Sequence, residues 1–122
     1  MTMAALARGK HVLCEKPLGM IAAEAQEMYE EAQAAGVVHM VNFTFHGVPV
    51  YMYMKDLVSA GYVGDIYHIA INWQGTFNRG DVMTWRREVA QAGYGALGDL
   101  GSPAVDMARW LCGEVRRVSA HL

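Results

Sequence analysis

The sequence predicts an α/β segment followed by an α+β segment, and three patterns in its 122 residues support this prediction. Two short apolar runs, Lys10 to Glu15 and Val37 to Phe43, flank a segment with helical periodicity, which is the arrangement of a β-α-β unit with parallel strands. Residues 66–74 alternate between apolar and polar side chains, as a strand of a one-sided antiparallel sheet does. We therefore expect a parallel part, residues 1–43, and an antiparallel part, residues 44–122.

The parallel part is predicted to hold a helix on either side of its first strand. Met3 to Ala7 is typical of the last turns of a helix, and Gly9 suits the left-handed position that follows. Between the two apolar runs, apolar side chains recur at helical spacing with glutamates on the other face, and Gly36 suits the end of that helix. The apolar positions are Ile21, Ala25, Met28, Ala32 and Ala35.

The second part is predicted to contain two helices and a further strand beside residues 66–74. Pro49 suits the first turn of a helix and Gly61 suits its end, so residues 50–60 are expected to be helical. A second helix is expected near Gly98 to Leu111, followed by a strand from Arg117 to Leu122. The sequence therefore predicts that helices and strands are both present after the parallel unit.

Two segments of the second part are expected to make contacts. One face of the alternating run is apolar enough either for an interface with another protein surface or for packing on the last helix. Its residues are Tyr67, Ile69, Ile71 and Trp73. The segment 75–95, which contains four glycines, is long for a loop and is therefore expected to have a function.

Composition and charge exclude several classes of function. A net charge of −2 and a pI near 6.2 provide no basic surface for nucleic acid or for an anionic membrane. Cys14 and Cys112 form no C-x-x-C pair, and the five histidines show no ligand spacing, so no metal is expected. No apolar run reaches the roughly 18 residues of a membrane span, and no signal peptide is recognisable. We expect a cytoplasmic protein.

The tripeptide Glu15-Lys16-Pro17 lies where the first predicted strand ends. In open α/β sheets, ligands bind at the carboxyl ends of the strands. A proline after Lys16 ends ladder pairing and favours an extended lysine backbone. Lys16 is therefore expected to face a ligand at the edge of the sheet, and an ordinary surface lysine after a strand is the alternative.

A second cluster surrounds Asp99 in the last predicted helix. Gly98 and Gly101 each cost about 0.8–1.0 kcal/mol relative to alanine in a helix interior, which indicates the close approach of a flat ligand or of a packed neighbour. Asp99 would be costly to bury unpaired, so it is expected to face Lys16 or a substrate hydroxyl. Asp106 and Arg109 are expected to form a surface pair three residues apart.

Together these motifs resemble the Gfo/Idh/MocA family of oxidoreductases along essentially the whole chain. The residues that carry the resemblance are Glu15-Lys16-Pro17, the run from Gly95 to Ser102, Asp106, and Arg109-Trp110-Leu111. The resemblance implies an NAD(P)-dependent dehydrogenase that acts on a sugar, a polyol or a related hydroxyl or carbonyl compound, usually as a homo-oligomer. It also implies that residues 1–43 end a Rossmann-type dinucleotide-binding domain and that residues 44–122 begin an antiparallel-sheet α+β domain for substrate binding and oligomerisation.

The resemblance also implies roles for individual residues. Lys16 matches the catalytic lysine of the family, and Asp99 matches the aspartate of its Asp-x-x-x-His pair, whereas the histidine is replaced by Pro103. A helix through Pro103 would be kinked, and a helix that begins with Ser102 as N-cap would be free of strain. The residues expected to bind the cofactor, NAD or NADP, are Glu15, Lys16, Pro17, Asn42, Trp85 and Arg86.

Some of these assignments have plain structural alternatives. Asn42 could satisfy a turn at the end of its strand, and Trp85 could anchor a loop. His46 is the histidine closest to the strand end and is expected to be solvated.

No G-x-G-x-x-G turn follows a first strand in this chain, so we expect an internal portion of a larger enzyme, inactive alone and unable to bind NAD or NADP tightly. A non-catalytic binding or assembly module derived from the family is the alternative. A glycine-rich loop encoded within about a hundred residues upstream would favour the enzyme, and a true start at Met1 would favour the module.

Overall fold

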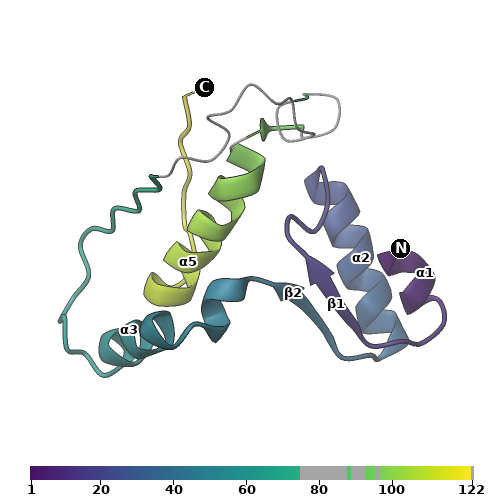
Figure 1. Cartoon of the computed structure of the whole chain (residues 1–122), viewed down its shortest axis with the longest axis horizontal. Coiled ribbons are helices and arrows are strands. Elements are labelled where there is room, and N and C mark those ends of the chain that lie inside the picture. Colours follow the sequence, from purple (N-terminus) through teal and green to yellow (C-terminus); the bar gives the residue numbers. More distant parts are fainter. Residues whose placement is uncertain (75–87, 89–92, 96, 122) are drawn as a thin grey trace.

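The structure is a computed structural model and describes residues 1–74, 88, 93–95 and 97–121. The elements are α1 (Thr2–Leu6), β1 (Val12–Glu15), α2 (Ala22–Ala35), β2 (His39–Asn42), the 3-10 turn η1 (Thr44–Gly47), α3 (Pro49–Ser59), the π turn η3 (Leu97–Gly101) and α5 (Ser102–Cys112). Figure 1 shows them in two groups, with α1, α2 and the strands at one end of the molecule and α3 and α5 at the other.

The first group is the parallel β-α-β unit that the sequence predicts. β1 and β2 pair in parallel, with Val12 opposite His39 and Glu15 opposite Asn42, and α2 connects them. Gly36 ends α2 with a φ of 61°, in the left-handed region that glycine adopts without strain. Because both strands run the same way, their carboxyl ends meet at one edge of the sheet.

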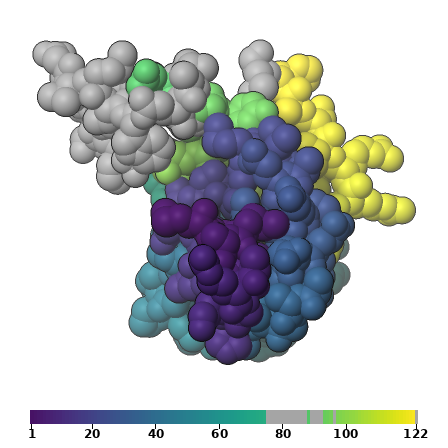
Figure 2. Space-filling model, turned by 90° about the vertical axis from the view of Figure 1, so that its right-hand side faces the viewer, coloured from purple at the N-terminus to yellow at the C-terminus, as the bar shows by residue number. Residues whose placement is uncertain are grey.

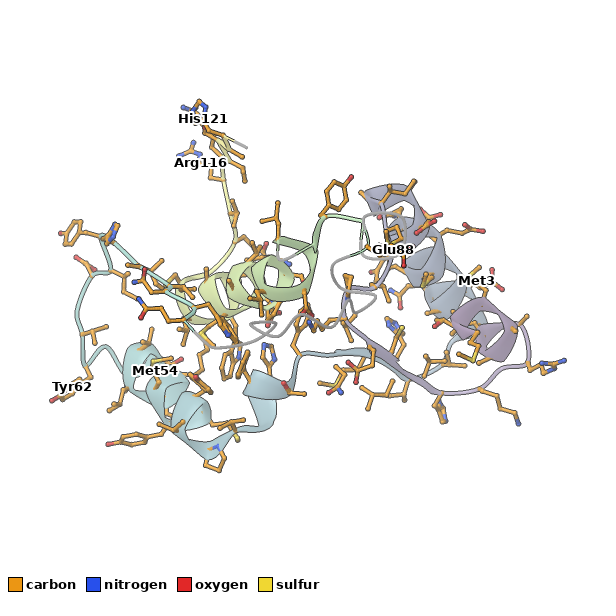
Figure 3. All side chains as sticks on the ribbon, turned by 45° about the horizontal axis from the view of Figure 1, so that its top comes forward. Met3, Met54, Tyr62, Glu88, Arg116 and His121 are labelled. Atoms are coloured by element: carbon orange, nitrogen blue, oxygen red, sulfur yellow. The ribbon has the colours of Figure 1, made fainter. Side chains whose placement is uncertain are left out.

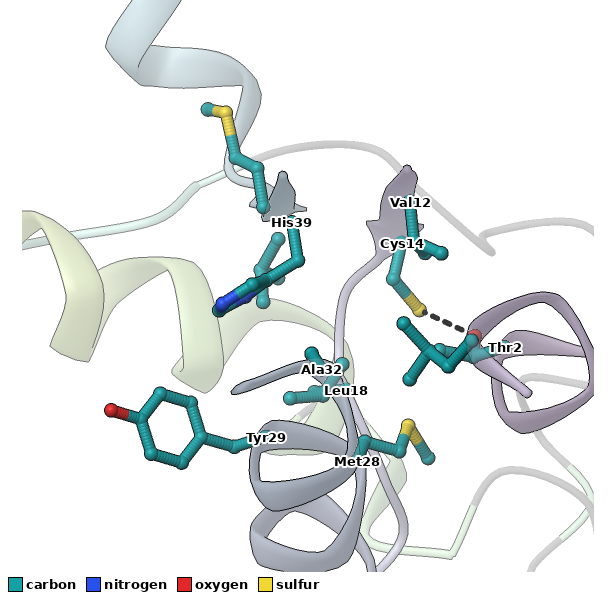
Figure 4. Close-up of a pocket in the computed structure, with 11 residues that line it drawn as sticks. Thr2, Val12, Cys14, Leu18, Met28, Tyr29, Ala32 and His39 are labelled. Carbon is teal, nitrogen blue, oxygen red and sulfur yellow. Dashed lines mark hydrogen bonds between the residues drawn. The ribbon is translucent and has the colours of Figure 1, made fainter. Parts of the chain in front are cut away.

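α1 and α2 pack on one face of this sheet and form its core. Leu6 and Ala32 are only 2% and 3% exposed. A small apolar pocket lies between the two helices and the strands, where the hydroxyl of Thr2 is 3.3 Å from the sulfur of Cys14 (Figure 4). Figure 2 shows α1 on the outer side of this group, in front of the other elements.

The other face of the sheet exposes apolar side chains. Leu13 and Met40 lie opposite each other in the register and are 65% and 53% exposed, and Val38 beside them is 72% exposed. An apolar surface of adjacent residues of this kind marks a contact with another protein segment. The parallel pair is also a very small sheet, and two strands alone are marginal in water.

We expect the isolated 122-residue chain to self-associate through this face. Light scattering at tens of micromolar should therefore report dimers or larger species. The double variant Leu13→Ser/Met40→Ser should shift the chain toward monomer, whereas Tyr62→Ser, at a 78% exposed tyrosine remote from the sheet (Figure 3), should leave association unchanged. A monodisperse parent chain would contradict this expectation.

The second group is built on the packing of α3 against α5. Met107 and Leu111 of α5 are 7% and 8% exposed. Pro49 occupies the first turn of α3, as the sequence predicts. The ammonium of Lys55 on α3 donates a 2.6 Å hydrogen bond to the carbonyl of Trp110, near the end of α5, where helix carbonyls lack partners within the helix.

The predicted antiparallel strands are not present in the described part of the chain. Residues 66–74 and 117–121 have no strand structure, so both strand predictions were wrong for these residues (Figures 1 and 3). A strand forms only where the main chain of a neighbouring strand pairs with it by hydrogen bonds. No described residue pairs in this way with residues 66–74 or 117–121. Residues 69–74 instead line a groove with Met107 and Leu111 of the last helix, and Tyr67 remains 92% exposed.

Asp106 and Arg109, predicted to form a surface pair, are not joined by a hydrogen bond or an ion pair, and Asp106 acts on Arg109 only through its charge. Arg109 bonds Glu114 through two contacts of 2.7 and 3.0 Å, because the chain turns back at Gly113 after α5. The hydrogen bond from Arg109 lowers the pKa of Glu114, so the pair contributes stability above the ordinary glutamate pKa and loses it as pH falls through the lowered value. Both side chains are exposed, so the contribution is small.

No helix within the described residues is both long and apolar enough to cross a membrane.

Candidate active site at the edge of the parallel sheet

The carboxyl ends of β1 and β2 bring three polar side chains to one edge. Glu15 and Asn42 are paired in the register, and the Asn42 amide donates a 2.6 Å hydrogen bond to the Glu15 carboxylate. Lys16 follows directly after Glu15, and its peptide bond to Pro17 is cis. This is the edge at which open α/β sheets bind ligands.

Lys16 reaches across to the start of the last helix and bonds Asp99. Its ammonium donates one 2.6 Å hydrogen bond to the Asp99 carboxylate and another 2.6 Å hydrogen bond to the Asp99 main-chain carbonyl. The two side chains are 24% and 31% exposed, so the pair is accessible to a small ligand. The contact between Lys16 and Asp99 that the sequence indicates is therefore present.

The position of Asp99 depends on an unusual helix start. Leu97–Gly101 forms a π turn, and the α-helix begins at Ser102 with Pro103 buried in its first turn. Of the two alternatives drawn from the sequence, a helix that begins here is the one observed, although Gly101 rather than Ser102 holds the N-cap position. The Ser102 hydroxyl donates to the carbonyl of Gly98 at 3.1 Å instead.

A pocket of about 130 Å³ opens on the Lys16–Asp99 pair. Its lining residues are Glu15, Lys16, Asn42, Phe43, Thr44, Phe45, Trp73, Asp99, Leu100 and Pro103. Typical small-molecule pockets measure about 300–1,000 Å³, so these residues form one wall of a site rather than a complete one.

The aromatic side of this pocket was not recognised from the sequence. The rings of Phe45 and Trp73 lie 5.2 Å apart, and Phe45 also meets Tyr51 edge-on at 5.1 Å. The available signal was the aromatic end of the alternating run, at Trp73, together with the aromatic residues that follow β2. An apolar wall beside a charged pair suits a ligand with an apolar face and polar edges.

His46 is not solvated, so that prediction was wrong. Its Nε2 lies 2.7 Å from a carboxylate oxygen of Asp106, and its ring stacks on Trp110 with centroids 4.3 Å apart. The side chains of His46 and Asp106 are 29% and 19% exposed. Because Phe43 packs beside His46, at 6.2 Å between rings, this cluster supports the pocket wall from behind.

None of the other residues predicted to bind the cofactor is among the described residues that line this pocket. Trp85 and Arg86 lie outside the described residues. Pro17 is exposed and does not line the pocket. Gly93, Gly95 and Gly98 have the spacing G-x-G-x-x-G, which marks a dinucleotide-binding turn only between a strand and a helix, and residues 89–92 before them lie outside the described part of the chain.

Sequence models of two protein-family domains match the two parts of the chain. Residues 1–43 match the oxidoreductase family with an NAD-binding Rossmann fold, and residues 51–122 match the GFO/IDH/MocA C-terminal domain. The chain therefore combines part of a Rossmann NAD-binding domain with part of a second, mixed α/β domain.

Individual relatives agree with this match. Levoglucosan dehydrogenase of Pseudarthrobacter phenanthrenivorans is 35% identical over 98% of this chain and 31% of its own length. 1,5-Anhydro-D-fructose reductase of Ensifer adhaerens is 32% identical over 93% of this chain and 34% of its own length.

Solved structures give the same result. An NAD-binding oxidoreductase from Klebsiella pneumoniae is 37% identical, with a TM-score of 0.76 over 93% of this chain and 31% of the other. A levoglucosan dehydrogenase solved with NADH and levoglucosan is 32% identical, with a TM-score of 0.77 over 93% of this chain and 31% of the other. The chain spans about a third of the length of these relatives.

Proposed function

This chain belongs to the Gfo/Idh/MocA oxidoreductase family, and we propose that it carries the reacting-oxygen site of an NAD(P)-dependent dehydrogenase for a sugar, a polyol or a related hydroxyl or carbonyl compound. The observation that carries the proposal is the Lys16–Asp99 pair at the carboxyl edge of the parallel strands. A non-catalytic module derived from the family would not require an accessible lysine that is held at this edge by an aspartate.

The side chains at the strand ends suit the nicotinamide end of a dinucleotide. Asn42 uses one of its two N–H donors on Glu15, so its second donor and its amide oxygen can serve a carboxamide or a ribose. Glu15 offers a carboxylate to ribose hydroxyls at the same edge. We propose that these two residues, with Lys16, Pro17, Trp85 and Arg86, contact the dinucleotide, which accepts or donates a hydride when bound.

Lys16 is proposed to bind the reacting oxygen of the substrate. An ammonium has three N–H donors, and two of those of Lys16 are directed to Asp99, so one remains for a substrate oxygen. That hydrogen bond would stabilise the negative charge that develops on the oxygen as its proton leaves. Asp99 orients the ammonium, and Phe45 and Trp73 offer an apolar surface to the carbon side of a sugar.

We further propose that residues 1–43 and 44–122 belong to different domains of the complete protein, with the site between them. The antiparallel sheet expected of the second domain would need partner strands from other parts of the protein. The complete protein is proposed to be a homo-oligomer, as the resemblance implies.

A substrate screen on the full-length protein tests the proposed function. With NAD+ or NADP+ present, at least one sugar or polyol, levoglucosan among those tried, should support formation of the reduced nicotinamide, followed by its absorbance. Dinucleotide binding should be measured in parallel by calorimetry. A protein that binds a dinucleotide but oxidises no member of a broad panel, and reduces none of the matching carbonyl compounds, would favour the non-catalytic alternative.

A further inference from the structure

Pro103 has no main-chain N–H, and this affects the Asp99 carbonyl to which Lys16 donates a hydrogen bond. Gly101, where the π turn meets α5, has helical φ and ψ of −70° and −41°, so the helical backbone continues from Leu97–Gly101 into α5. In an α-helix, each N–H donates to the carbonyl four residues earlier, and the residue four before Pro103 is Asp99. Proline has no N–H, so residue 103 cannot donate to the Asp99 carbonyl. This oxygen accepts the 2.6 Å hydrogen bond from the Lys16 ammonium.

The backbone around Pro103 is consistent with an Asp99 carbonyl that receives no hydrogen bond from residue 103. The π turn Leu97–Gly101 ends immediately before the turn that contains Pro103, and π turns inside helices are frequent at functional sites. Pro103 is itself buried and lines the same pocket as Lys16 and Asp99. The residue that lacks the donor and the lysine that supplies one therefore meet at the same site.

We propose that Pro103 is a positioning residue for Lys16: it makes the main-chain carbonyl of Asp99 an acceptor for the ammonium, which is then held by two oxygens of one residue. A main-chain oxygen in a helical turn is fixed more firmly than a carboxylate that can rotate. Lys16 is thus held with its third N–H directed away from Asp99. Only the catalytic use of this arrangement depends on the function proposed above.

Chemical labelling of lysines tests the proposal without any substrate. An acylating reagent must reach the side-chain nitrogen, so a Lys16 nitrogen whose N–H groups are held by two acceptors should be labelled slowly. Mass spectrometry of the full-length protein should show that Pro103→Ala, which restores the N–H, raises labelling of Lys16 relative to the exposed Lys10 by about threefold or more. Pro49→Ala is the matched control, because Pro49 also lies in the first turn of a helix but does not line the pocket, and it should leave the ratio unchanged.

A second pair of variants removes the carboxylate from the comparison. Asp99→Asn keeps the main-chain carbonyl as an acceptor, so adding Pro103→Ala to it should raise Lys16 labelling further. Equal labelling in Asp99→Asn and in the double variant, or an unchanged ratio in Pro103→Ala, would overturn the proposal. Because no dinucleotide or substrate is present, such a result would leave the proposed dehydrogenase function standing, and an inactive protein would leave the labelling result valid.

Discussion

Replacing Lys16 with methionine in the full-length protein should lower kcat by about 10²- to 10³-fold, the usual cost of removing one donor from a developing oxyanion. Methionine keeps an unbranched side chain of similar length and removes the charge and all three N–H donors. The loss should appear mainly in kcat, because the hydrogen bond strengthens as charge develops on the substrate oxygen. Steady-state kinetics with the substrate found by screening would measure it.

Lys10→Met is the control for this experiment. Lys10 is also a lysine, lies at the start of the same strand segment and is exposed on the surface, so its loss should change kcat by less than about twofold. A Lys16→Met enzyme with a kcat near that of the parent would show that the reacting oxygen is bound elsewhere.

Restoring the missing imidazole with Pro103→His should raise kcat by at least about tenfold. A general base typically contributes 10²- to 10⁴-fold to rate, and no imidazole is present at this position in the chain. Pro103 lines the pocket beside Asp99, so a histidine there would be close to a bound substrate hydroxyl. The gain should be larger when the variant is compared with Pro103→Ala, because both substitutions restore the N–H and only one adds a base.

Comparing Pro103→His with Pro103→Ala separates the effect of the added imidazole from the effect of the restored main-chain N–H. Because an N–H at position 103 would compete with Lys16 for the Asp99 carbonyl, Pro103→Ala should not raise kcat, and an equal rise in both variants would show that the gain does not come from the imidazole. An unchanged kcat in Pro103→His would show that another group takes the proton or that a step other than chemistry limits turnover.

The parts of the fold that could be predicted are those whose contacts join residues close to one another in the sequence. The β-α-β unit follows from apolar runs, helical periodicity and the glycine that ends α2 at Gly36, all within about thirty residues. The strand expected over residues 66–74 failed because alternation describes a side-chain pattern, and a strand also requires a partner that the described residues do not contain.

Some contacts of the candidate site could be predicted from the sequence and others could not. The Lys16–Asp99 contact joins distant parts of the chain, and it was predicted from the cost of burying Asp99 unpaired together with a family resemblance rather than from local pattern. The pairing of His46 with Asp106 is equally distant, and no motif indicated it, so sequence spacing alone favoured Arg109 as the partner of Asp106. Trp73 was assigned to a sheet face, and only the chain path that follows α3 brings it to the pocket.

A crystal structure of the full-length protein with a dinucleotide and a sugar or polyol substrate tests the central claim most directly. The account predicts that an oxygen of the substrate lies within about 3.2 Å of the Lys16 ammonium while Asp99 remains bonded to it. A substrate bound with all its oxygens well beyond hydrogen-bond reach of Lys16, or in another pocket, would contradict it.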